Sequence, residues 1–113
     1  MTEIERTIVK SPPELWELVD DDELIARWTE ELTTESAELA VKICHREDGR
    51  RLHWEGSAED VAIAVELEIA EKGWGTWISI KTAGSGERAD ADSVLERLLD
   101  ELGSANRRPF SRG

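Results

Sequence analysis

The segment from residue 60 to residue 70, DVAIAVELEIA, constrains the fold more than any other part of the chain. Every second residue is branched and apolar (Val61, Ile63, Val65, Leu67 and Ile69), whereas alanine and glutamate occupy the positions between. This period of two predicts a β-strand with one buried and one solvated face. A sheet with one wet face needs a large apolar partner for the other face.

A second alternating segment, AELAVKICH at residues 37–45, precedes the Asp-Gly pair at 48 and 49, which is a strong signal for a hairpin turn. An even-length loop there keeps apolar residues opposite apolar residues. In that register His45 lies opposite Leu52, Ile43 opposite Trp54, and Cys44 opposite His53. His45 is then predicted to point toward the inner, apolar face.

Residues 74–82, WGTWISIKT, form a third alternating segment after a turn near Gly73. The alternation predicts that Trp74 and Ile78 face inward and that Trp77 faces outward. Residues 3–10 form a further predicted strand. We therefore expect an antiparallel meander with one wet face.

Helical signals lie on both sides of these strands. In SPPELWELVDDDELIARW, residues 11–28, Ser11 with Glu14 forms a capping box and Asp20 with Glu23 offers a second one, which predicts two short helices. The longest predicted helix covers about residues 88–102 and ends before Gly103. Its apolar positions follow helical spacing: Ala91, Val94, Leu95, Leu98, Leu99 and Leu102. The inner face of the sheet is the partner available to this helix.

This order of elements resembles the START-like, or helix-grip, superfamily (SRPBCC, Bet v 1-like), which includes polyketide cyclase/dehydrase-like and Aha1-like proteins. The resemblance rests on IERTIVKSPPELWELVDDDELIARW, GRRLHWEG, VAIAVELEIAEKGWGTWISIKTAG and VLERLLDELG. It implies an α+β fold in which a curved antiparallel sheet grips the C-terminal helix. The expected domain spans residues 1–103, with a disordered tail at 104–113. The segment between Trp28 and GRRLHW is shorter than usual, which leaves room for one strand fewer.

The resemblance also implies a cavity between sheet and helix for a hydrophobic or amphipathic small molecule. The residues expected to line it are Ile43, His45, Trp54, Val65, Ile78, Leu95 and Leu98. A histidine at the mouth of an apolar cavity suits a general base or a ligand anchor, although a half-buried histidine bonded to backbone or water is the simpler interpretation. The C-terminal helix would act as a lid.

The sequence predicts no convincing catalytic set. Cys44 and His53 face each other across the expected hairpin, but neither an orienting third group nor an oxyanion loop accompanies them. As metal ligands they are only two, whereas zinc takes three or four, so we expect no metal site. No cofactor is expected either, because the glycines of the GSG segment lack a phosphate-loop pattern.

Charge narrows the classes of partner. The chain of 113 residues carries 14 Lys and Arg against 26 Asp and Glu, a formal net charge of -12. Such a charge disfavours nucleic acid and anionic membranes. The basic cluster of Arg107, Arg108 and Arg112 lies in the expected tail. With one cysteine and neither a signal peptide nor a long apolar run, the default setting is cytoplasmic without membrane insertion.

Three functions are compatible with the sequence. The first is a non-catalytic domain that binds a hydrophobic small molecule. The second is a co-chaperone-like protein-interaction module whose interior is filled by its own tryptophans and whose outer face, around Trp77, binds a protein. The third is a polyketide cyclase/dehydrase-like enzyme with His45 as its base.

Overall fold

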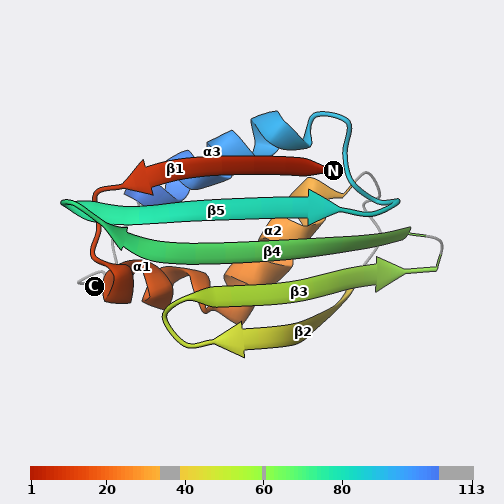
Figure 1. Cartoon of the computed structure of the whole chain (residues 1–113). Helices are drawn as coiled ribbons and strands as arrows, with labels where there is room; N and C mark the ends of the chain where they lie inside the picture. The colour runs from red at the N-terminus through yellow and green to blue at the C-terminus, as the bar shows by residue number, and fades with distance from the viewer. Residues whose placement is uncertain (34–38, 60, 105–113) are drawn as a thin grey trace, which may run out of the picture.

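The computed structural model describes residues 1–33, 39–59 and 61–104. The tail arginines, and nearly all of the segment predicted to be disordered, lie outside the described residues. The elements are β1 (Thr2–Ile8), α1 (Pro12–Val19), α2 (Asp22–Leu32), β2 (Ala40–Glu47), β3 (Arg51–Ala58), β4 (Val61–Lys72), β5 (Gly75–Ala83) and α3 (Ala91–Ser104). The predicted order of strand, two short helices, meander and long helix is confirmed (Figure 1).

The strands form one antiparallel sheet in the order β1-β5-β4-β3-β2. The first strand joins the last, so the N-terminal segment closes one edge while the β2–β3 hairpin forms the other. The three helices of the described residues lie against the same face of the sheet, the inner face, and none of them covers the outer face (Figure 1). The fold is therefore α+β with a curved sheet, as expected.

Local capping explains why two short helices, α1 and α2, begin close together near the N-terminus. The Ser11 hydroxyl accepts a hydrogen bond from the Glu14 N–H, 3.4 Å away, with Pro12 at the first helical position. The second cap is Asp21 rather than the predicted Asp20, and its carboxylate accepts from the N–H of Glu23 at 2.8 Å. Asp20 instead caps the C-terminal end of α1, where its backbone N–H donates a hydrogen bond to the Trp16 carbonyl at 2.8 Å.

A single core joins the helices to the sheet. The inner-face residues of β4 from Ile63 to Ile69 are buried, and so is the apolar face of α3. Ion pairs fix two sides of α3: Arg6 of β1 pairs with Asp100, and Arg97 pairs with Glu31 of α2. No helix among the described residues is long and apolar enough to span a bilayer.

Candidate functional site

The interior, where the sequence predicts a ligand cavity, is densely packed. Five of the predicted lining residues, Trp54, Val65, Ile78, Leu95 and Leu98, are 0% exposed and belong to one core cluster. A side chain that lined an enclosed cavity would still present surface to a water-sized sphere inside it. Trp54, Val65, Ile78 and Leu95 therefore contact protein on all sides, whereas Leu98 also borders a small hollow between the helices. Ile43 packs against the same cluster from its edge.

Helix α2 packs closely against β3 in this interior. The Trp54 indole N–H donates a hydrogen bond to the Thr29 hydroxyl at 2.8 Å, and that hydroxyl donates to the Ile25 carbonyl at 2.6 Å. The helix comes so close to β3 that a Cβ on Gly56 would lie 2.5 Å from the Thr29 methyl carbon. Thr29 is itself fully buried, so α2 packs directly on β3 at this point, beside α3 on the same face of the sheet. Sequence reasoning missed Thr29, although a threonine on the buried stripe of a helix is a signal that a polar partner lies opposite.

A small apolar hollow of about 60 Å³ lies where α1, α2 and α3 meet. It is lined by Leu18, Leu24, Arg27, Trp28, Leu98, Glu101 and Leu102. The Trp28 indole N–H is buried without a hydrogen-bond partner among the described residues. This volume is far below the roughly 300 Å³ at which small-molecule pockets begin.

The β2–β3 hairpin corrects the predicted position of His45. The loop between Glu47 and Arg51 has three residues, an odd number, with Gly49 at φ 78. Near the turn, the pairing of β2 with β3 is therefore shifted by one residue from the predicted register, and His45 lies opposite His53 instead of Leu52. A bulge between Ile43 and His45 then restores the predicted pairing of Ile43 with Trp54.

As a result, His45 is exposed on the outer face, and the prediction that it points inward is wrong. Its Nε2 lies 3.2 Å from a Glu47 carboxylate oxygen, and this hydrogen bond lowers the pKa of Glu47 below its ordinary value. The inner-side position opposite Leu52 belongs to Arg46, whose guanidinium pairs with Asp20 at 3.0 Å. The predicted ligand-binding role of His45 stays a prediction, without the inward orientation on which it rested.

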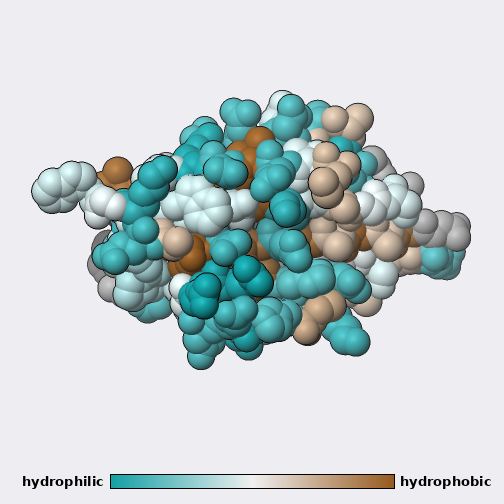
Figure 2. All heavy atoms as spheres, viewed as in Figure 1, coloured by the Kyte–Doolittle hydropathy of each residue, from teal (hydrophilic) through white to brown (hydrophobic). Residues whose placement is uncertain are grey.

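The outer face of the sheet carries a groove of about 310 Å³. It crosses β1, β5, β4 and β3 and is lined by Glu3, Glu5, Arg51, Glu66, Leu67, Glu68, Trp77, Ser79 and Lys81. We call it the outer groove. Figure 2 shows this face, on which hydrophilic residues dominate. Four carboxylates against two cationic side chains give the outer groove an acidic character.

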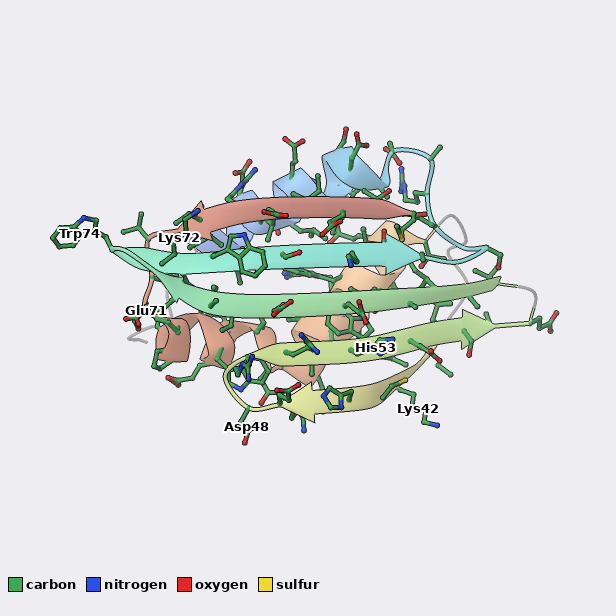
Figure 3. The ribbon with its side chains drawn as sticks, in the orientation of Figure 1. Lys42, Asp48, His53, Glu71, Lys72 and Trp74 are labelled. Carbon is green, nitrogen blue, oxygen red and sulfur yellow. The ribbon has the colours of Figure 1, made fainter. Side chains whose placement is uncertain are left out.

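The two tryptophans of the β4–β5 hairpin have different environments. Trp77 faces outward as predicted, and its indole N–H donates to Glu5 at 3.1 Å. Trp74, predicted to face inward, is 98% exposed, because Lys72 pairs with Gly75 and leaves Gly73 and Trp74 as a two-residue turn. In Figure 3 the Trp74 side chain extends away from the end of the sheet.

Cys44 and His53 lie close together on the outer face, and Glu55 joins them. One ligand atom from each, the thiol sulfur, a ring nitrogen and a carboxylate oxygen, all lie within 4.8 Å of one another. The prediction counted only two potential ligands, which is wrong for the folded chain. Glu55 was missed because it is far from Cys44 in sequence, although it shares a strand face with His53 at a spacing of two.

The carboxylates with shifted pKa values take part in separate local contacts. Burial raises the pKa of Glu87, but hydrogen bonds from Thr82, Thr2 and the terminal amine outweigh it, and the net pKa lies below 4.5. The bidentate hydrogen bond from Arg88 lowers the pKa of Asp90. Each of these pKa shifts arises from hydrogen bonds to neighbouring groups. Among the described residues, Glu87 and Asp90 do not form an acid–base pair with each other.

The fold and its uncovered sheet face define the class: this chain has the helix-grip fold of START-like, Bet v 1-like proteins. Among solved structures, CalU16 from Micromonospora echinospora is similar over 89% of this chain and 70% of its own, with 22% identity and a TM-score of 0.64. Ara h 8.0201 matches over 89% and 90% with 13% identity and a TM-score of 0.59.

The Aha1 dimer from Colwellia psychrerythraea matches over 92% of this chain and 98% of its own, with 12% identity and a TM-score of 0.56. At these identities the likeness concerns the fold. No protein-family model matches the sequence, and no curated protein gives a significant match.

Proposed function

We propose that this domain is a protein-interaction module that binds a basic segment of a partner protein in the outer groove. The observation that carries the proposal is the contrast between the two faces of the sheet. The inner face is covered by the packed core, whereas the outer face presents an acidic groove around an indole.

The chemistry of the outer groove suits lysine and arginine side chains. Glu3, Glu5, Glu66 and Glu68 outnumber Arg51 and Lys81, and Arg51 already pairs with Glu68 at 3.4 Å. A cation above the half-exposed Trp77 ring would gain about 0.5–1 kcal/mol. The net charge of -12 would add long-range attraction that weakens with salt.

A lysine- and arginine-rich peptide, titrated by calorimetry and by amide chemical shifts, tests the proposal. Shifts are expected along β1, β5 and β4, and Glu66→Lys should weaken binding several-fold. Glu96→Lys, an equal charge change at an exposed position of α3, is the matched control and should leave affinity within about twofold. Equal losses in both variants would show that only net charge attracts the peptide, and would refute a specific groove.

A second candidate is binding of a hydrophobic small molecule between the sheet and α3, non-catalytically. The indole N–H of Trp28 is buried beside the small hollow and has no hydrogen-bond partner among the described residues, which favours this candidate. Withdrawal of α3 at the hollow would open the interior. Ile43, Trp54, Val65, Ile78, Leu95 and Leu98 would then line the opened space. A cyclase/dehydrase-like reaction is not proposed, because His45 lies outside the interior.

A fluorescent hydrophobic dye separates the two candidates. Leu98→Ala, which enlarges the space beside Trp28, should increase dye uptake if the interior opens, while Trp77→Ala should leave it unchanged. Absence of dye uptake by both the native protein and Leu98→Ala would remove the small-molecule candidate and leave the interaction module.

A further inference from the structure

The β-bulge in β2 brings three chemically different metal-ligating groups together on the outer face. Cys44 is the extra residue of the bulge, and His53 and Glu55 lie on the neighbouring strand β3 with their side chains on that face. If the pairing of His45 with His53 continued without the bulge, Cys44 would lie opposite Trp54, on the inner face. With it, the thiol sulfur lies within 4.8 Å of both the imidazole and the carboxylate ligand atoms.

From this geometry we propose that Cys44, His53 and Glu55 bind a zinc ion. The thiolate, imidazole and carboxylate are all ligand types that zinc accepts, and a thiolate with an imidazole selects a softer ion than Mg²⁺ or Ca²⁺. Three protein ligands leave the fourth tetrahedral position to water, as in zinc sites that stay open to solvent.

The distances require only small side-chain movements. Zinc bond lengths of about 2.0–2.3 Å place tetrahedral ligand atoms roughly 3.3–3.8 Å apart. The observed limit of 4.8 Å is about one ångström longer. Cys44 and Glu55 are exposed and His53 is half-buried, so side-chain rotation can supply this movement without disturbing the core.

The surroundings favour a cation. Glu66 of β4 lies opposite His53 on the same face and adds negative charge, and the chain as a whole is strongly acidic. Lys42, opposite Glu55, is the cation nearest in register, and in Figure 3 its side chain extends beyond the edge strand, away from His53. His45, the other histidine, is occupied with Glu47 at 3.2 Å.

Titration of the reduced full chain with Co²⁺, followed by displacement with Zn²⁺, tests this site. A single equivalent of Co²⁺ should produce the near-ultraviolet charge-transfer band of a cobalt–thiolate bond, and Zn²⁺ should remove it. Cys44→Ser should abolish the band, and His53→Gln and Glu55→Gln should each weaken Zn²⁺ binding by about tenfold or more. His45→Gln is the matched control and should bind Zn²⁺ as the native chain does.

Alkylation of Cys44 gives an independent readout in the native chain. Zn²⁺ should slow the reaction of the thiol with iodoacetamide, and the protection should be lost in His53→Gln but kept in His45→Gln. The proposal is overturned if Co²⁺ gives no thiolate band. It is also overturned if His45→Gln lowers affinity as much as His53→Gln, since the ligands would then be a different set.

Discussion

Replacement of Thr29 by valine tests whether α2 is fixed in the interior by its hydrogen bond to Trp54. Valine has nearly the shape of threonine, so the change opens no cavity, but the Trp54 N–H loses its acceptor at 2.8 Å. Trp54 is 0% exposed, and a buried donor without a partner costs about 1–3 kcal/mol. The Ile25 carbonyl keeps its helical partner, so we expect a total loss of about 2 kcal/mol.

Urea unfolding followed by circular dichroism measures this loss as a drop in midpoint of about 1 M, given slopes of 1–3 kcal/mol/M. Thr33→Val is the matched control and should cost less than about 1 kcal/mol. Among the described residues the Thr33 hydroxyl only donates a hydrogen bond, to the Thr29 carbonyl at 2.5 Å, so its loss leaves no buried donor unpaired. In a Trp54→Phe background, Thr29→Val should be nearly neutral. If Thr29→Val cost as much there as in the native chain, the hydrogen bond would not be the reason for its effect.

Three further predictions address other parts of the structure. Gly56→Ala should destabilise the domain by about 1–3 kcal/mol in urea unfolding, because the new Cβ meets the Thr29 methyl. Adding Thr29→Ser to this variant removes that methyl, keeps the hydroxyl and should restore most of the lost free energy of unfolding. Because the pKa of Glu87 is lowered on folding, its stabilisation is present above its ordinary value of 4.5 and is lost as pH falls toward the folded value. Glu87→Gln should therefore lower the thermal midpoint at neutral pH and flatten its decline in acid; an unchanged acid slope would contradict this. Trp74→Ser should change the free energy of unfolding by less than about 0.5 kcal/mol, since the indole is 98% exposed, and a larger loss would place Trp74 in a contact that the structure lacks.

Candidate-site residues were predictable only where they depend on alternation alone. The inward positions of Trp54, Val65 and Ile78 follow from the period of two, and the structure buries all three. The predicted inward direction of His45 was wrong because that direction depends on the length of the loop and on the bulge, and the alternation of residues encodes neither. The third metal-ligating group, Glu55, shares a face with His53 by alternation, but its closeness to the Cys44 thiol depends on the register of β2 against β3.

The sequence by itself determined the kinds of element, their order and, away from the hairpin turns, the faces they bury. These features are properties of short segments, so they can be recognised without knowing how the segments pack. They include the period-two and helical spacings, the caps at Ser11 and among the aspartates, and the resemblance to helix-grip proteins. The tertiary structure decided what lies between sheet and helix and what lies on the outer face. Whether an interior is filled depends on how closely α2 approaches β3 at Gly56, and whether distant side chains form a groove or a metal site depends on cross-strand register. The helix–strand distance and the cross-strand register are both set by how all the elements pack together, so neither can be read from a single segment.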